Sequence, residues 1–259
     1  MSYDLSILRE GVREYGITLT DRQEEQFIRY YELLVQWNEV MNLTAITEFD
    51  QVLLKHFADS LSIAGTLDMG KIHSCIDVGT GAGFPGIPLK IAFPHLKVTL
   101  LDSLNKRLNF LNEVIGELGL EKISTVHLRA EEGGKKPEYR EKYDLAVSRA
   151  VSRLAALCEY CMPYVRKGGF FVSYKAGQAE EEIKEGKTAI SVLGGKLAKT
   201  ESFHLCNTDM ERTLVVIKKV KDTPKKYPRK PGTPAKEPLG SAKYQQGILI
   251  YFIAQSALL

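Results

Sequence analysis

The chain has 259 residues, of which 44% are hydrophobic and 26% are charged, a composition typical of a globular protein. No apolar run reaches the roughly 18 residues that a membrane helix needs, and the amino-terminal segment lacks the pattern of a signal peptide. The four cysteines are too few for a disulfide scaffold. We therefore expect a cytoplasmic protein that does not contact a membrane.

The formal net charge of +3 is unevenly distributed along the chain. Nine basic and two acidic residues lie between residues 218 and 243, so this stretch carries +7 and the remainder carries −4. Such a concentration of positive charge is typical of an arm that binds a polyanion, but a solubilising tail has the same composition. Charge alone does not decide between them.

The first part of the chain is predicted to be helical. Thr20 and Gln23 have the spacing of a capping box. Apolar residues then recur at alternating spacings of three and four, which predicts a long amphipathic helix: Phe27, Tyr30, Leu34, Trp37 and Met41. With a second helix over 48–64, residues 1–70 form a helical extension whose apolar faces must pack on a larger domain.

From residue 74 onward, short apolar runs alternate with helical patterns, which is typical of a parallel sheet. The predicted strands are 75–78, 98–101, 124–128, 145–148 and 170–174, and the predicted helices are 87–93, 106–118, 151–164 and 179–193. Two further strands, 196–204 and 213–220, follow each other without a helix between them. This order predicts an α/β fold of the class I methyltransferase (Rossmann-like) type, a mostly parallel sheet with a closing antiparallel hairpin, over 71–220. Residues 221–259 form a basic arm rich in Lys and Pro with an apolar tail.

Cys158 and Cys161 form a CxxC pair. A zinc site needs more ligands, and neither a second CxxC nor a nearby His supplies them. Because the pair lies in a predicted helix, we expect two buried apolar side chains and no metal.

A glycine-rich loop follows the first strand of the sheet. Gly79, Gly81 and Gly83 allow the chain to turn sharply and its backbone to approach a ligand closely. Asp102 ends the second strand, where an acidic side chain meets the hydroxyl groups of a ribose. Since Phe84 stands where a dinucleotide fingerprint has its third glycine, S-adenosylmethionine is favoured over NAD or FAD as the cofactor.

Several separate motifs resemble the glucose-inhibited division protein B family, the RsmG guanine-N7 methyltransferases of 16S ribosomal RNA. They occur in the family's order from about residue 5 to residue 239: 41–46 (MNLTAI), 56–61 (HFADSL), 79–86, 129–132 (RAEE), 148–151 (SRAV) and 229–234 (RKPGTP). The resemblance implies a cofactor site that includes Gly79, Phe84, Ala130, Glu131 and Arg149. It also implies that the target is a guanine in the decoding region of 16S rRNA, within the small ribosomal subunit, and we expect a monomer.

The residues that act on the RNA are less clearly indicated. Arg149 is the first candidate for holding the base or its phosphate, and Asn42 and Lys175 are weaker candidates. Arg229 and Lys230, in a loop rich in Pro and Gly, are expected to grip phosphates.

His56 is a further candidate for RNA binding. His56 and Asp59 share a helix face, so Asp59 could orient the imidazole, but a capping or packing role for the pair is at least as compatible with this spacing.

The mechanism predicted for an N7 target needs no general base, because guanine N7 already carries a lone pair. The residues alone leave an alternative open, in which Glu131 is a solvated loop carboxylate and Arg149 forms a structural ion pair with a nearby acid. Rival functions are a methyltransferase of the same fold that acts on another RNA position or a small molecule, and a non-catalytic RNA-binding factor. Residues 240–259, with an apolar run over 247–254, extend beyond the resemblance.

Overall fold

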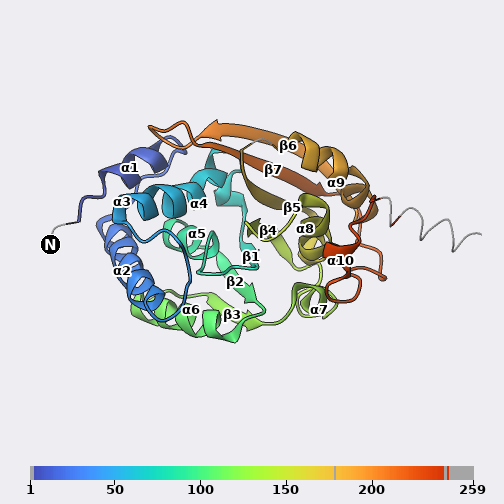
Figure 1. Ribbon diagram of the computed structural model, residues 1–259, viewed down its shortest axis with the longest axis horizontal. Coiled ribbons are helices and arrows are strands. Elements are labelled where there is room, and N and C mark those ends of the chain that lie inside the picture. The colour runs from blue at the N-terminus through green and yellow to red at the C-terminus, as the bar shows by residue number, and fades with distance from the viewer. Residues whose placement is uncertain (1–2, 178, 242–243, 245–259) are drawn as a thin grey trace, which may run out of the picture.

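A seven-stranded sheet forms the centre of the protein in the computed structural model, which describes residues 3–177, 179–241 and 244 (Figure 1). The strand order is β3-β2-β1-β4-β5-β7-β6. Strands β1 to β5 run parallel, whereas β7 is antiparallel to both β5 and β6. The strands are β1 Ser74–Val78, β2 Lys97–Asp102, β3 Ile123–His127, β4 Tyr143–Arg149, β5 Val165–Ala176, β6 Gly195–His204 and β7 Glu211–Lys219. This topology confirms the predicted class I methyltransferase fold with its closing hairpin.

Helices cover both faces of this sheet (Figure 1). The α-helices are α1 Ser6–Arg13, α2 Asp21–Asn38, α3 Phe49–Val52, α4 Asp59–Leu61, α5 Gly86–Ala92, α6 Asn105–Glu117, α7 Ala130–Gly133, α8 Leu154–Cys161, α9 Glu180–Val192 and α10 Thr233–Lys236. The predicted helix over 48–64 is continuous but changes type, because a π-helical segment, Leu53–Ala58, joins α3 to α4. The short helices α1, α7 and α10 were not predicted.

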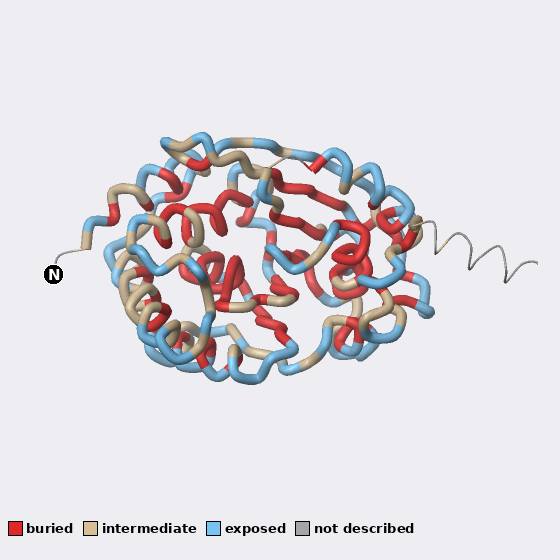
Figure 2. Tube along the Cα trace, viewed as in Figure 1, coloured by how far each residue is buried: buried red, intermediate tan, exposed pale blue. Residues whose placement is uncertain are grey.

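The alternation of side chains along each strand separates two hydrophobic cores. Cys75 and Leu100 belong to the core beneath α1 to α6, whereas the next residues, Ile76 and Leu101, belong to the core beneath α8 and α9. Figure 2 shows the central strands buried and the outward faces of the helices exposed. In open α/β sheets, ligands bind at the carboxyl ends of the strands, so the loops that follow these ends are where a site is expected.

The amino-terminal helices share the first of these cores. Phe27 and Tyr30 of α2 are fully buried in the same cluster as Ile87 of α5 and Phe110 of α6. The capping box at the start of α2 is confirmed, with the Thr20 amide donating to Gln23 Oε1 over 2.9 Å. The predicted apolar face of α2 therefore packs on the sheet domain. The helices before residue 70 share their hydrophobic core with the sheet, so the domain boundary near residue 70 stays a prediction.

The basic arm does not extend away from the protein over the part that the structure describes. Residues 220–241 run back across α7 and α8, with Tyr227 and Leu239 buried. The Arg140 guanidinium fixes this path by donating to the carbonyl oxygens of Gly134, Thr223 and Tyr227 over 2.7 to 2.9 Å. The apolar run 247–254 lies outside the described residues.

Candidate active site

The loop after β1 turns sharply at its glycines. Gly79, Gly81 and Gly83 have φ angles of 73°, 61° and 96°, values that residues with a Cβ rarely adopt. The amides of Gly79 and Thr80 donate to the Leu101 carbonyl oxygen over 2.8 and 3.1 Å. The loop backbone is therefore fixed against the end of β2.

A buried carboxyl group holds the same loop from below. Asp77 Oδ2 accepts hydrogen bonds from the Thr80 hydroxyl over 2.7 Å and from the Gly86 amide over 2.8 Å. Its other oxygen, Oδ1, has no hydrogen-bond partner among the described residues. Burial raises the pKa of the Asp77 carboxyl to about 6, because the two hydrogen bonds offset only part of the loss of water.

Helix α2 supports the loop from the side. The Tyr30 hydroxyl, which is buried, donates a hydrogen bond to the Ala82 carbonyl oxygen. A Cβ atom at Gly83 would lie 2.6 Å from this hydroxyl oxygen, so only glycine leaves room for the tyrosine. Gly83 was predicted to bind the cofactor, but the structure places it behind the loop, against Tyr30.

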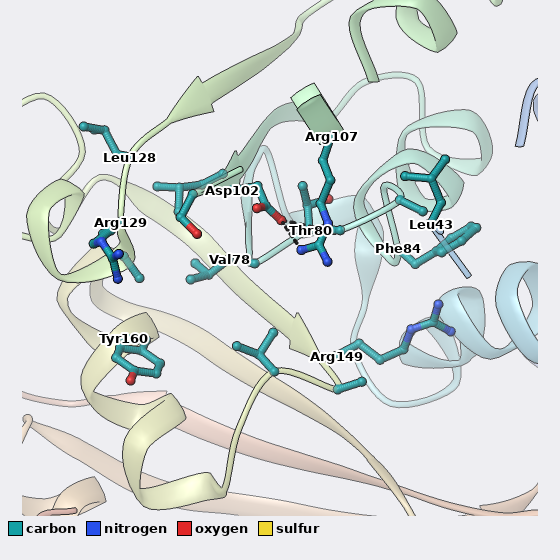
Figure 3. Close-up of a pocket in the computed structure, with 18 of the residues that line it drawn as sticks. Leu43, Val78, Thr80, Phe84, Asp102, Arg107, Leu128, Arg129, Arg149 and Tyr160 are labelled. Atoms are coloured by element: carbon teal, nitrogen blue, oxygen red, sulfur yellow. Dashed lines mark hydrogen bonds and ion pairs between the residues drawn. The ribbon is translucent and has the colours of Figure 1, made fainter. Parts of the chain in front are cut away.

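A first cavity of about 540 Å³ opens at the carboxyl ends of β1, β2 and β4 (Figure 3), a size suited to a cofactor. It brings together seven of the residues that the sequence predicted for the cofactor: Gly79, Gly81, Phe84, Asp102, Ala130, Glu131 and Arg149. Its apolar walls include Leu128 and Tyr160, and Leu43 contributes from the amino-terminal region. Segments far apart in the sequence thus form one site.

The acidic end of this cavity fits an adenosine group. Asp102 is 2% exposed, and its carboxylate accepts hydrogen bonds from the amides of Gly81 and Leu104 over 3.0 and 2.9 Å and from Arg107 over 3.3 Å. A carboxylate has roughly four acceptor positions, so it can also bind a ribose hydroxyl group. Among the residues that the structure describes, apart from Gly81 and its two chain neighbours, no heavy atom lies within 4 Å of the place that a Cβ of Gly81 would occupy, which leaves the loop backbone open to a ligand.

The opposite end of the cavity is formed by three stacked groups. The rings of His56 and Phe84 lie 4.5 Å apart between centroids with an angle of 22°, and Arg149 Cζ lies 5.0 Å from the Phe84 centroid. Arg149 Nη2 is 3.3 Å from His56 Nδ1, and His56 Nε2 is 2.8 Å from Thr44 Oγ1. The contact with arginine, which can only donate, requires Nδ1 to accept, whereas the Lys55 carbonyl oxygen, 3.2 Å from Nδ1, would require it to donate. Burial, with a smaller effect of Arg149, lowers the pKa of His56 to about 3, so the imidazole is neutral near pH 7.

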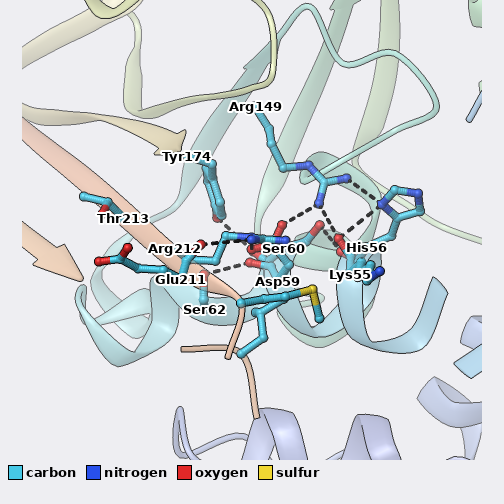
Figure 4. Close-up of polar contacts among 12 residues, drawn as sticks. Lys55, His56, Asp59, Ser60, Ser62, Arg149, Tyr174, Glu211, Arg212 and Thr213 are labelled. Carbon is cyan, nitrogen blue, oxygen red and sulfur yellow. Dashed lines mark hydrogen bonds and ion pairs between the residues drawn. The ribbon is translucent and has the colours of Figure 1, made fainter. Parts of the chain in front are cut away.

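Asp59 pairs with two arginines and not with His56 (Figure 4). Arg149 Nη1 lies 2.8 Å from Asp59 Oδ2, and Arg212 Nε lies 3.2 Å from Asp59 Oδ1. The idea that Asp59 orients the imidazole is therefore wrong, because its carboxylate is engaged elsewhere and Thr44 holds the ring. The packing alternative describes His56 better.

A second cavity of about 330 Å³ adjoins the first. The two share His56, Arg149 and Ala150. The remaining lining residues of the second cavity are Ile46, Lys55, Asp59, Tyr174, Lys175, Ala176 and Arg212. Four cationic side chains against one carboxylate give this cavity a positive charge.

The weaker candidates differ in position. Lys175 lines the second cavity, but its ammonium group also lies 2.6 Å from Glu182 Oε2 and 2.9 Å from the Ser152 carbonyl oxygen. Asn42 is exposed and lines neither cavity. Lys175 therefore lies at the edge of the second cavity, and a role of Asn42 in RNA binding or catalysis stays a prediction.

Arg229 and Lys230, the two basic residues predicted to bind phosphates, differ in their surroundings. Arg229 donates to both carboxylate oxygens of Glu159, over 3.0 Å from Nε and 2.7 Å from Nη2, and the Glu159 side chain is completely buried. Lys230 is exposed. Only Lys230 presents its charge to the solvent.

The CxxC pair lies in a helix and is buried, as the sequence predicted. Cys158 and Cys161 are buried in α8. Within 3–177, 179–241 and 244, no cluster of three or more His, Cys, Asp or Glu side chains could hold a metal ion. No helix in the same part of the chain is long and apolar enough to cross a membrane.

Comparison with known proteins settles which methyltransferases this fold belongs with. The family model described as rRNA small subunit methyltransferase G matches residues 23–215. The chain belongs to this family. It is 56% identical to the ribosomal RNA small subunit methyltransferase G of Lachnoclostridium phytofermentans, covering 91% of this chain and 98% of that protein. With the same-named protein of Bacillus subtilis it shares 52% identity over 88% of this chain and 96% of that one.

Several solved methyltransferase structures each match about 57 to 65% of the chain. One is a geranyl diphosphate methyltransferase in complex with SAM, with a TM-score of 0.45, 12% identity, and coverage of 57% of this chain and 78% of that one. The strand order described above and the family membership together make the protein an S-adenosylmethionine-dependent methyltransferase of class I fold.

Some residues of this small-subunit methyltransferase site were not predicted from the sequence. Arg212, Thr44 and Tyr160 line the cavities without belonging to a glycine-rich or acidic motif. Gly232 was quoted only as part of a basic loop, yet it lines the first cavity. Their neighbours in space lie far away in sequence, so no local pattern marks them.

Proposed function

We propose that the protein transfers a methyl group from S-adenosylmethionine to N7 of a guanine in the decoding region of 16S rRNA. Family membership supports the reaction. The observation that carries the proposal is the pair of adjoining cavities, one suited to adenosine and one lined by cationic groups, which meet at His56 and Arg149. Two substrates held in adjoining cavities can react without a covalent enzyme intermediate.

The first cavity would hold the cofactor. Asp102 would bind the ribose, the backbone at Gly79 and Gly81 would lie against the ligand, and Leu128 and Ala130 would flank the adenine. When bound, S-adenosylmethionine supplies an electrophilic methyl group on a sulfonium centre. The neutral His56 and the Phe84 ring stack at the end of the first cavity that adjoins the second.

The second cavity would receive the guanine nucleotide. Guanine N7 has a lone pair, so the protein does not have to remove a proton from it. The titratable groups there fit this requirement: Asp59 is held by two arginines, and the lowered pKa of His56 makes its imidazole a weak base. The chain's contribution would be to align the base and to bind its phosphates through Arg149 and Arg212.

The exposed lysines of the arm would bind additional phosphates. Lys225, Lys226, Lys230 and Lys236 are all exposed, and each phosphate contact contributes to a salt-dependent affinity. We propose that the substrate is the small ribosomal subunit, that the protein acts as a monomer, and that it works in the cytoplasm.

The test uses small subunits from a strain that lacks the enzyme. The purified protein is incubated with labelled S-adenosylmethionine and either these subunits or protein-free 16S rRNA, and the label is mapped by mass spectrometry. A single 7-methylguanine in the decoding region is expected, with more label on the subunits than on the free RNA. Label on another atom or another RNA would contradict the proposal, and cofactor binding without any methyl transfer would indicate a non-catalytic protein.

A further inference from the structure

Helix α7 carries two residues of the first cavity but has only four residues, Ala130–Gly133. A helix of one turn has no stability of its own, so its position depends on the groups that pack against it. On one side, the Tyr164 hydroxyl donates to the Ala130 carbonyl oxygen over 2.7 Å. On this side the sheet domain itself fixes the helix.

The other side of α7 is held by the arm. The Gly232 amide donates to Glu131 Oε1 over 2.8 Å, and Glu131 is 6% exposed. A Cβ atom on Gly134 would lie 3.2 Å from Pro228 Cγ, which shows how closely the arm approaches. Because Gly232 also lines the first cavity, the arm forms part of the wall of the cofactor site.

Arg229 is the anchor of this part of the arm. Its backbone amide donates to Glu159 Oε1 over 2.7 Å, its guanidinium binds both oxygens of the same carboxylate, and Nη2 also donates to the Glu237 carbonyl oxygen over 2.8 Å. The Glu159 side chain has no exposed surface. A bidentate ion pair between a guanidinium and a buried carboxylate fixes the geometry of both partners. The contacts of Arg229 therefore set the position of Gly232, three residues further along the chain.

We propose that Arg229 is a positioning residue for the cofactor cavity and not a phosphate contact. It holds the arm so that Gly232 fixes Glu131, while exposed lysines such as Lys230 meet the RNA. The inference rests on the proposed function in one respect, namely that the first cavity binds S-adenosylmethionine. It also predicts that the arm contributes to cofactor affinity when no RNA is present.

The experiment measures S-adenosylmethionine binding by isothermal titration calorimetry without RNA. Arg229→Met is expected to raise the Kd about tenfold, the loss that corresponds to one charge-assisted hydrogen bond in the wall. Lys230→Ala, its neighbour, is expected to leave this Kd unchanged. Equal affinity of Arg229→Met and the native protein would overturn the inference. If the native protein itself bound no cofactor, the proposed function would fall as well, so the two failures are distinct.

RNA binding supplies a second readout. Lys230→Ala is expected to lower the slope of log affinity against log salt by about one, as for a lost phosphate contact, whereas Arg229→Met is expected to leave the slope unchanged. A slope reduced by Arg229→Met together with an unchanged cofactor Kd would identify Arg229 as a phosphate contact and refute the proposal.

A double variant separates affinity from stability. Arg229→Met alone leaves a buried carboxylate unpaired and is expected to lower the melting temperature, whereas Arg229→Met with Glu159→Leu removes both charges and is expected to restore it. The double variant is still expected to bind the cofactor about tenfold more weakly, because the arm has lost its anchor. Native affinity in the double variant would show that Arg229 serves stability alone.

Discussion

The two adjoining cavities are built in different ways. The first is formed mostly by consecutive residues at the ends of neighbouring strands, with Gly79 and Gly81 after β1 and Asp102 at the end of β2. The second is formed by side chains from separate regions, and its central ion pairs join Asp59 of α4 to Arg149 of β4 and Arg212 of β7. A site made of backbone and local turns depends on few residues, whereas a site made of long-range ion pairs depends on each partner. The two cavities should therefore respond differently to substitution.

The largest effect is expected at the junction of the cavities. Arg149→Ala removes the group that touches His56, Phe84 and Asp59. We expect the rate of methyl transfer to fall about 10²- to 10³-fold, since a positioned charged donor is lost from the junction of the two cavities. The rate is measured with labelled cofactor and unmodified small subunits. Arg149→Lys, which keeps the charge, serves as the control, and an unchanged rate for Arg149→Ala would remove this residue from the site.

A smaller effect, confined to the first cavity, is expected for Asp102→Ala. The carboxylate holds the Gly81 amide and would bind the ribose, so the Kd for S-adenosylmethionine should rise about 10- to 100-fold. At saturating cofactor, the rate should recover. Arg107→Met, which removes only the more exposed partner of Asp102, should change the Kd much less, and an equal effect of both variants would contradict this assignment.

The reverse pattern is expected for the second cavity. Arg212→Gln removes a cationic group that lines only this cavity, so the KM for the small subunit should rise about tenfold while the Kd for the cofactor stays the same. Both constants are measured on the same preparation, and thermal unfolding checks that Asp59, still paired with Arg149, keeps the fold intact. A weakened cofactor Kd would show that the two cavities are not separable.

The last expected effect, on stability and not on binding or catalysis, concerns the pH dependence of Asp77. Because its folded-state pKa of about 6 lies above its ordinary value, the folded protein binds this proton more tightly than the unfolded chain does. The stabilisation is fully present below about pH 4 and is lost as the pH rises through about 6. Asp77→Asn, which cannot ionise, should therefore gain stability relative to the native protein between pH 4 and 6, by about 1 to 3 kcal/mol, and keep this gain above pH 6. Urea unfolding from pH 4.5 to 7.5 measures the difference; a gain that does not change with pH would exclude Asp77 as its source.

Local patterns account for what the sequence could predict. Strand periodicity and the glycine loop were enough to place β1 to β5, the closing hairpin and most of the first cavity, because these features involve neighbouring residues. Arg229 shows the limit. Its sequence neighbours are basic and indicate phosphate binding, but its partner Glu159 lies 70 residues earlier, in a helix whose other buried side chains are all apolar. The pairing of Asp59 with Arg212 spans 153 residues and has no local signal either.

The contact between Tyr30 and the glycine loop couples the folding of the amino-terminal helices to cofactor binding. Helix α2 is synthesised before β1, but Tyr30 can complete its burial only when Ala82 and Gly83 have turned beneath it. The loop in turn reaches its final shape only with the tyrosine in place. The amino-terminal helices and the cofactor loop should consequently form in a single cooperative step, and a truncated chain without α2 would be expected to lose its cofactor before it lost its sheet.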